Sequence, residues 1–178
     1  MEYENFKTLA LNRQSCRDFN GEEVEIEKLQ KAVDIALLAP SACNSQPWKI
    51  YCVTTPEKRE MVLDAVTEKN RNLFLKKATA FMVIAEREAK IMKDVEQRFH
   101  SGFFVKYDVG ELIAYLTLAL KEQGLESCII GWVNADKLKE TLSLGEKEGA
   151  HLVVAVGKSS IPLRQKTRKP KEEVVEFI

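Results

Sequence analysis

Apolar residues recur at helical spacing in several segments of the chain, and six segments in all are predicted to be helices, although residues 88–99 are polar and poorly patterned. The clearest segment covers residues 25–38, where Ile26, Leu29, Val33 and Leu37 fall in register along one face. Such a spacing predicts an amphipathic helix. The other predicted helices cover residues 5–13, 56–68, 88–99, 105–122 and 135–142.

Four short segments instead predict β-strands, covering residues 49–54, 78–85, 127–132 and 151–156. The second is apolar without a break, which is typical of a strand buried on both faces. Helices and strands mix without strict βαβ repetition, so the pattern favours an α+β fold over a doubly wound sheet. The sequence contains neither G-x-G-x-x-G after a strand nor G-x-x-x-x-G-K-[ST], the usual nucleotide-binding motifs.

The segment from Val105 to Glu122 is the predicted central helix. Between Leu112 and Leu120 it is apolar on nearly all faces, so we expect it in the core or in a subunit interface. This stretch is far shorter than the roughly 20 residues that cross a bilayer. After Gly157 the pattern of apolar positions ends, and an extended tail is expected.

The composition is that of an ordinary soluble protein with a single domain over residues 1–178. Hydrophobic residues make up 45% and charged residues 30%, with 27 Lys and Arg against 27 Asp and Glu. This balance creates no global field for nucleic acid or a membrane, so electrostatic recognition must be local. The acidic start of the chain lacks the apolar core of a signal peptide, and we expect a cytoplasmic protein.

Cysteine and histidine are too few and too scattered to indicate a metal centre. Four cysteines without a C-x-x-C pair, together with two histidines, do not provide the spacing of a zinc site. We therefore expect free thiols and no metal.

A first candidate binding segment, Arg13-Gln14-Ser15-Cys16-Arg17, follows the first predicted helix. Two arginines and a hydroxyl within five residues can grip an oxyanion, because guanidinium groups bind such oxygens in a bidentate manner. Taken alone, a solvated basic turn is the better interpretation.

A second candidate is the loop from Pro40 to Trp48, between a helix and a strand. Its small residues would let the backbone approach a flat ligand closely. Asn44 and Gln46 each offer a donor and an acceptor, as the edge of a planar heterocycle requires, and two prolines stiffen the loop. The alternative is a polar helix-to-strand turn, but the density of amide and hydroxyl groups favours a binding site.

The third candidate lies in the C-terminal tail. Residues 158–171 contain six basic side chains and no acid. Within them, Lys166-Thr167-Arg168-Lys169-Pro170 suits a phosphate group. A charged, solvated tail explains this segment equally well.

Together the three segments resemble the pattern of the nitroreductase family. They appear in the order R-x-S-x-R, P-S-x-x-N-x-Q-P-W and K-x-R-x-P, and the stretch from Gly124 to Gly131 also resembles the family's segment after its central helix. The resemblance covers nearly the whole chain. It implies a three-layer α+β fold with a mainly antiparallel central sheet flanked by helices. It also implies noncovalently bound FMN, NAD(P)H as hydride donor, and a homodimer with FMN at the subunit interface.

The resemblance also implies a role for individual residues. Arg13, Lys166 and Arg168 would hold the FMN phosphate, and Ser15 and Arg17 would reach the ribityl chain and the pyrimidine side of the ring. Residues 40–44 would line the ring, Asn44 and Gln46 would bond its polar atoms, and residues 129–131 would present backbone groups near flavin N5. The implied cofactor-binding residues are Arg13, Gln14, Ser15, Arg17, Pro40, Ser41, Ala42, Cys43, Asn44, Gln46, Asn72, Ile129, Ile130, Gly131, Lys166 and Arg168.

Some positions depart from the pattern or stay open. Ile129 stands where many short members carry an aromatic residue, and Ile130 where some carry an acid, so only a backbone role transfers to Ile130. Asn70 competes with Asn72 for the asparagine at the flavin, and Asn72 is preferred. His100, Phe103 and Phe104 could line an acceptor pocket, or they could be a surface histidine and two core aromatics.

The expected function is therefore hydride transfer from NAD(P)H through bound FMN to a small acceptor such as a nitroaromatic, a quinone or a flavin, in a ping-pong scheme. No side chain is expected to act as a catalytic acid. A specialised flavoprotein on the same scaffold is the alternative, namely a dehalogenase, a cobinamide-related enzyme or an enoyl-type reductase. A non-enzymatic binding domain with a basic tail is another, although the tail lacks the aromatic residues that stack on bases. The choice between NADH and NADPH stays open.

Overall fold

The computed structural model of the protein describes residues 3–100 and 102–178. The helices of this part of the chain are α1 (Tyr3–Asn12), α2 (Ile26–Ala36), α3 (Pro56–Thr67), α4 (Lys93–Phe99), α5 (Val105–Glu122) and α6 (Ala135–Leu142). The strands are β1 (Trp48–Val53), β2 (Ala80–Glu86), β3 (Glu126–Ile130) and β4 (Gly149–Gly157). Short 3-10 turns cover Ala42–Asn44, Glu68–Asn70, Leu73–Lys77 and Lys171–Glu173.

The four strands form one sheet in the order β1-β2-β4-β3, and every neighbouring pair is antiparallel. The two central strands are the most apolar, because their side chains are covered on both faces of the sheet. In β2 every residue from Ala80 to Ala85 is buried, as its unbroken apolar run predicts. Each strand ends within two residues of its predicted bounds.

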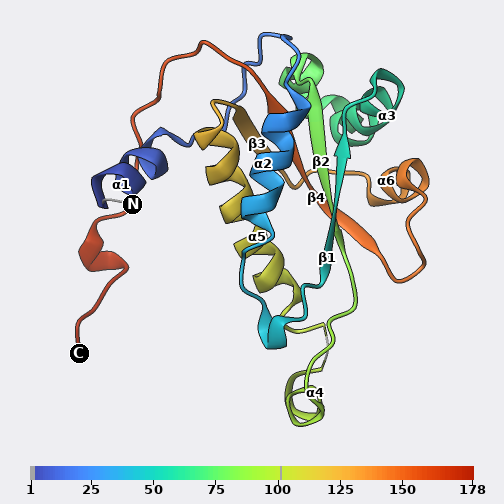
Figure 1. Ribbon diagram of the computed structural model, residues 1–178, viewed down its shortest axis with the longest axis vertical. Helices are drawn as coiled ribbons and strands as arrows, with labels where there is room; N and C mark the ends of the chain where they lie inside the picture. The colour runs from blue at the N-terminus through green and yellow to red at the C-terminus, as the bar shows by residue number, and fades with distance from the viewer. Residues whose placement is uncertain (1–2, 101) are drawn as a thin grey trace.

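Helices cover both faces of this sheet, which gives three layers (Figure 1). Successive side chains of a strand point to opposite faces, so Met82 and Ile84 pack against α2 and α5, while Phe81 and Val83 pack in the cluster that contains α3 and α6. The prediction of a three-layer α+β fold with an antiparallel central sheet is confirmed.

The helical prediction needs two corrections. Residues 88–92 are not helical, and α4 begins only at Lys93; the segment before it instead packs Ala89 and Ile91 against the core as chain without regular secondary structure. In α2 the buried face is formed by Leu29, Ala32 and Ala36, so small alanines make the close contact with α5. The predicted positions Ile26 and Leu37 are about half exposed, at 54% and 48%.

The central helix α5 has the bounds that the sequence predicts. Leu112, Leu116 and Leu120 are fully buried between α2 and the sheet, whereas Tyr115 is 41% exposed on the other side of the helix. None of the helices in the described chain is both long enough and apolar enough to span a membrane.

The C-terminal tail leaves β4 and runs back towards α1 (Figure 1). From residue 158 onwards its only regular element is the short turn at Lys171–Glu173. At its start, Lys158 donates to the Glu25 carboxylate at 3.0 Å. This contact, followed by the hydrogen bond within Glu25 itself, lowers the pKa of Glu25 to about 2. The ends of the chain are therefore brought together around α1.

Leu116 tests the packing of α5 on the sheet. Leu116→Ala should lower the free energy of unfolding by about 2–5 kcal/mol, because it leaves a cavity in a fully buried position. Met61→Ala on α3, where the side chain is 44% exposed, should change it by less than about 1 kcal/mol. Urea unfolding of both variants makes the comparison, and equal losses would contradict this account of the core.

Candidate functional site

A cavity of about 280 Å³ lies between the segment that follows α1 and the C-terminal tail. Five of the residues that line it are cationic, and within the described chain no acidic residue contributes to its wall. The basic residues are Arg13, Arg17, Arg164, Lys166 and Arg168. We call this region the basic cavity. Such a concentration of donors without a carboxylate suits a phosphate group.

Backbone pairing places the segment after α1 against the sheet. Ser15 forms an isolated parallel bridge with Ser127 of β3, and the Cys16 N–H donates to the Ser127 carbonyl at 2.9 Å. The segment thus pairs with the edge strand β3 at a single position. This contact holds Arg13 and Arg17 on a fixed piece of backbone.

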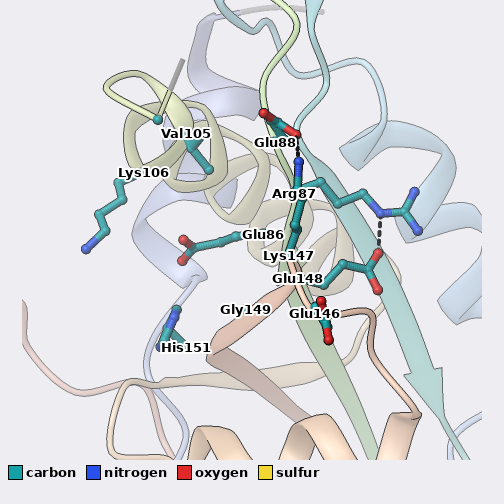
Figure 2. Close-up of a pocket in the computed structure, with 11 residues that line it drawn as sticks. Glu86, Arg87, Glu88, Val105, Lys106, Glu146, Lys147, Glu148, Gly149 and His151 are labelled. Carbon is teal, nitrogen blue, oxygen red and sulfur yellow. Dashed lines mark hydrogen bonds and ion pairs between the residues drawn. The ribbon is translucent and has the colours of Figure 1, made fainter. Parts of the chain in front are cut away.

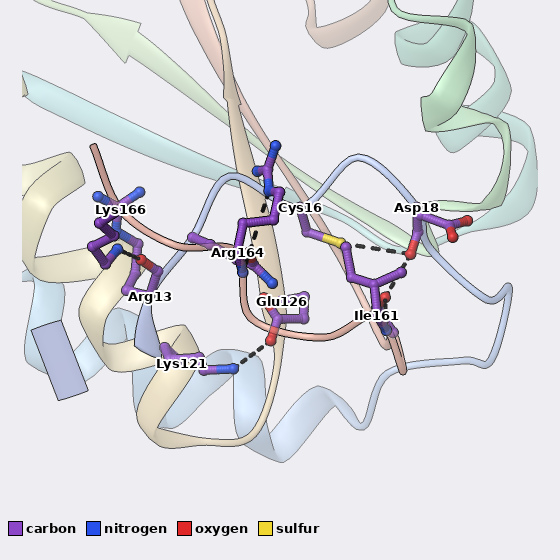
Figure 3. A network of polar contacts seen from close by, with 10 residues as sticks. Arg13, Cys16, Asp18, Lys121, Glu126, Ile161, Arg164 and Lys166 are labelled. Carbon is purple, nitrogen blue, oxygen red and sulfur yellow. Dashed lines mark hydrogen bonds and ion pairs between the residues drawn. The ribbon is translucent and has the colours of Figure 1, made fainter. Parts of the chain in front are cut away.

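The tail is fastened to the same segment by side chains (Figure 3). The Lys166 ammonium donates to the Arg13 carbonyl, and the Arg164 guanidinium donates to the Ser15 carbonyl. The buried Gln14 accepts at its Oε1 from the Arg164 backbone N–H at 3.2 Å. Gln14 also lines the basic cavity, so its side chain holds the tail there, and its role as a cofactor ligand stays a prediction.

The charges of the basic cavity repel one another. Partial burial, followed by the neighbouring charges of Arg13 and Arg168, lowers the pKa of Lys166 below its ordinary value. Glu126 lies in the same contact network (Figure 3), but Lys121 already pairs with it. A bound anion would relieve this repulsion, so the residues present fit the phosphate of a nucleotide.

The loop between α2 and β1 has an unusual backbone. Cys43, Asn44 and Gln46 have φ angles of 53°, 50° and 48°, a left-handed conformation that residues other than glycine rarely adopt. The Ser41 hydroxyl accepts from the Gln46 N–H at 2.9 Å, and the Gln46 side-chain amide donates to Asn44 Oδ1 at 3.2 Å. Cys43, Asn44 and Gln46 are exposed. We call residues 40–47 the amide loop.

Two of the three residues at the end of β3 for which a backbone role is predicted, Ile129 and Gly131, are exposed. Ile129 is 41% exposed, whereas Ile130 is buried and its side chain packs in the core. Asn72 lies beside this strand end, because its side-chain amide donates to the Val66 carbonyl at 2.9 Å and contacts the Trp132 carbonyl at 3.4 Å. The structure therefore places Asn72 near residues 129–132.

The structure brings the tail and the start of β3 to the segment after α1, but it does not bring the amide loop there. The loop is bound to Asp108 in the first turn of α5, whereas Ser15 meets β3 beyond the last turn of that helix. Asp108 and Lys121 are 13 positions apart, which corresponds to about 20 Å along a helix. Figure 1 shows the loop and the segment after α1 at opposite ends of the α2 and α5 layer.

A second polar cavity, of about 430 Å³, lies at the end of β2 and the start of β4 (Figure 2). Its charges pair with one another: Arg87 contacts Glu148 at 2.6 Å, and Lys147 contacts Glu88 at 3.1 Å. The Gly145 N–H and then Arg87 lower the pKa of Glu148. Because four acidic residues line this cavity against three Lys and Arg residues, it lacks the anion preference of the basic cavity.

The residues predicted to line an acceptor pocket, His100, Phe103 and Phe104, form an aromatic cluster. None of them lines the basic cavity or the second polar cavity. Phe103 packs edge to face against Phe104, with ring centroids 4.9 Å apart, and His100 lies 6.1 Å from Phe103. His100 is exposed and Phe103 is 40% exposed. A pocket role for these residues stays a prediction.

Sequence reasoning missed two residues that the structure brings into these regions. Arg164 lines the basic cavity and fastens the tail, and the run of basic residues that contains it was the available signal. Asp108 bonds the amide loop from 66 positions away, and no local pattern could reveal such a contact.

Fold and site together define an α+β protein with a cavity lined by five cationic residues beside its edge strand β3. The family model described as "Nitroreductase family" matches residues 10–158, and the chain belongs to that family. The predictions of a nitroreductase-family fold and of an NAD(P)H-dependent oxidoreductase are thereby confirmed. FMN with NAD(P)H as electron donor is the cofactor pair of this family. Among the described residues, no group of three or more potential ligands could hold a metal ion.

Individual relatives agree in length and fold. The chain is 23% identical over 209 aligned positions to an oxygen-insensitive NADPH nitroreductase of Helicobacter acinonychis, covering 100% of this chain and 99% of the relative. A nitroreductase family protein of Streptococcus pneumoniae has 24% identity and a TM-score of 0.82, over 97% of this chain and 100% of the other. A gut-bacterial enone reductase has 22% identity and a TM-score of 0.80, with both chains fully covered.

The basic cavity can be tested with two ligands that differ only in their phosphate. Arg13→Ala and Arg168→Ala should each raise the dissociation constant of FMN by about 10- to 100-fold, since hydrogen bonds to charged groups contribute about 1.5–3 kcal/mol. The riboflavin constant should change by less than about threefold. Lys169→Ala, in the same tail but outside the cavity wall, is the matched control. Fluorescence titration measures all four proteins, and equal losses for both ligands would contradict the phosphate assignment.

Proposed function

We propose that the protein is an FMN-dependent NAD(P)H oxidoreductase whose basic cavity holds the FMN phosphate. One observation carries this proposal: five cationic side chains surround a cavity whose described wall contains no acid. Membership of the nitroreductase family indicates FMN as the cofactor. The basic cavity would bind its phosphate, the most strongly charged group of FMN. We further infer that residues 1–178 act as one FMN-binding domain in the cytoplasm.

Within the basic cavity, different residues would contact different parts of FMN. Arg13, Lys166 and Arg168 would contact the phosphate, while Arg164 is already engaged with the Ser15 carbonyl and with Gln14. Ser15 and Arg17 follow on the same short extended segment, so they would reach the ribityl chain and the pyrimidine side of the ring. A cation at that edge would favour reduction, because negative charge develops there; a contact worth about 1.5–3 kcal/mol corresponds to tens of millivolts for a two-electron couple.

The end of β3 would lie along the ring. Ile129 and Gly131 are exposed, and the buried Ile130 between them leaves only its backbone for a ligand. Asn72 has its amide nitrogen engaged with backbone carbonyls, which leaves its Oδ1 as the free atom for the ring among the contacts described. A ring edge would thus meet backbone N–H groups and one amide oxygen.

We propose that the amide loop completes the site from a second copy of the chain. Within one protomer, about 20 Å of α5 separates the basic cavity from the amide loop. A single chain therefore cannot bring both regions to the same flavin ring. A two-fold dimer exchanges the halves reciprocally, which yields two equal sites. In this arrangement Asn44 and Gln46 would bond the polar atoms of the partner's flavin, and Pro40 to Cys43 would line its ring.

The surface between the two halves supports such a dimer. A groove of about 740 Å³ runs along α1, α2 and α5, and the residues that line it are largely apolar. Phe6, Ile35 and Tyr115 lie in this groove and are 50%, 49% and 41% exposed. Apolar patches of this kind mark protein interaction sites. The groove lies on the α2 and α5 layer, which has the basic cavity near one end and the amide loop near the other (Figure 1).

FMN, when bound, would accept a hydride from NAD(P)H and pass reducing equivalents to a small acceptor such as a nitroaromatic, a quinone or a flavin. The chain's own residues would position and charge the ring, and no side chain is assigned as a proton donor. One binding face would serve both NAD(P)H and the acceptor, because the described chain contains no separate dinucleotide motif. We therefore propose a ping-pong order.

Ile35 tests the link between assembly and flavin binding. Ile35→Asp should convert the protein to a monomer that has lost most of its FMN, because it places a charge in the apolar groove. Met61→Asp, a comparable change on α3 in the opposite layer, should leave the dimer and its flavin intact. Sedimentation velocity at the flavin wavelengths measures both. A 20.3 kDa species that still carries FMN would contradict the shared site.

Initial-rate kinetics test the proposed order. Double-reciprocal plots against NAD(P)H at several fixed quinone concentrations should give parallel lines, because the first product leaves before the acceptor binds. The measurement is made with FMN in excess, so that flavin loss does not distort the slopes. Lines that intersect would require both substrates on the enzyme together and would overturn the scheme.

A further inference from the structure

Asp108 is a buried acid with an incomplete set of partners. Its side chain is only 4% exposed, and it lies in the first turn of α5. The Ala42 N–H donates to its Oδ1 at 3.0 Å. Its Oδ2 is also buried, and it has no hydrogen-bond partner in the described part of the chain.

Stability of the core does not account for this carboxylate. Burying an acid with a single backbone partner is unfavourable unless further groups compensate for the lost hydration. The positive end of the α5 dipole favours an anion in the first turn, but neighbours such as Val105 and Val109 are apolar and buried. Among the described contacts, the one hydrogen bond of the Asp108 side chain comes from the amide loop.

The bond from Asp108 fixes the peptide at which the loop begins to turn. That peptide joins Ser41 to Ala42: its N–H donates to Asp108, and its carbonyl accepts from the Asn44 N–H at 2.9 Å. The next carbonyl, of Ala42, accepts from the Ser45 N–H at 3.0 Å. The peptide is therefore held on both sides, and the short turn Ala42–Asn44 starts from it.

The turn that follows is strained. Cys43 and Asn44 are left-handed although neither is glycine, and such a conformation persists only where the surroundings enforce it. The other side-chain contacts of the loop come from neutral groups, such as Ser41 on Gln46 and Ser45 on the Lys90 N–H. Asp108 is the charged group among the described contacts of this loop, and charged acceptors make the stronger hydrogen bonds.

We propose that Asp108 is a positioning residue for the flavin ring, acting through the Ala42 N–H on the conformation of the amide loop. This inference rests on the proposed function, in which the loop lines the ring. Because the loop would contact the ring and not the phosphate, loss of Asp108 should weaken FMN and riboflavin binding by the same factor. This separates its effect from that of Arg13 or Arg168.

The test compares three variants with the wild type. Asp108→Ala removes the acceptor, Asp108→Asn keeps an oxygen for Ala42, and Val109→Ala makes a cavity at the adjacent buried position without touching the loop. Asp108→Leu fills the space and replaces the alanine variant where that one is too unstable. The readouts are the dissociation constants of FMN and riboflavin, the visible flavin spectrum, and hydrogen exchange at the Ala42 amide in flavin-free protein.

Asp108→Ala should raise both dissociation constants by about tenfold or more, shift the flavin spectrum and expose the Ala42 amide to exchange. Asp108→Asn should restore binding to within about threefold of the wild type, and Val109→Ala should lower the melting temperature with both constants nearly unchanged. Equal binding by the Asp108→Ala and Val109→Ala variants would overturn the proposal, as would an Ala42 amide that stays protected in Asp108→Ala. A wild-type protein that takes up neither flavin would overturn the proposed function and the flavin role together, while exchange at Ala42 would still decide whether Asp108 holds the loop.

Discussion

The attachment of the C-terminal tail to the segment after α1 is the interaction on which the rest of the site depends. Lys166 and Arg164 donate to the carbonyls of Arg13 and Ser15, and Gln14 accepts from the tail backbone. These contacts collect cations from both ends of the chain around one cavity. Partial burial, followed by the nearby charges of Arg13 and Arg168, lowers the pKa of Lys166, so its charged form is disfavoured in this cavity. A bound phosphate would pair with the cations of the basic cavity, so the tail and the cofactor would stabilise each other.

The second constraint is the length of α5. The helix separates the basic cavity from the amide loop by about 20 Å, so in the proposed site neither region would be complete without the other. The proposed isologous dimer would solve this geometry, because each copy would give its loop and receive its partner's. The apolar groove on the same layer offers the contact surface that such a pairing needs. In this account Asp108 holds the amide loop in its final conformation before the dimer forms. Less conformational entropy is then lost when the loop meets the partner's flavin.

Much of this architecture could be predicted from the sequence, for reasons that differ between elements. The unbroken apolar run of β2 and the helical spacing in α5 are local signals, and both elements have nearly their predicted bounds. The buried face of α2 could be predicted only in part: Leu29 and Val33 pack in the core as expected, but Ala32 and Ala36 carry little hydrophobic signal while the half-exposed Ile26 and Leu37 carry much. In the site, Arg13 and Lys166 could be named from motifs, but their meeting depends on a contact across 153 positions. The bond from Asp108 to Ala42 spans 66 positions and could not be read from either segment.

Mixed dimers test the central claim, that each flavin site is assembled from two chains. One parent carries Arg13→Ala with Arg168→Ala and lacks the phosphate grip, and the other carries Asn44→Ala with Gln46→Ala and lacks the loop's amides. Each parent alone should bind little FMN and reduce a quinone slowly. After the two are unfolded together and refolded, each mixed dimer should contain one site with both defects and one with none, so roughly a quarter of wild-type sites and activity should return. A mixture that stays as inactive as its parents would show that each site lies within one chain, and it would contradict the account.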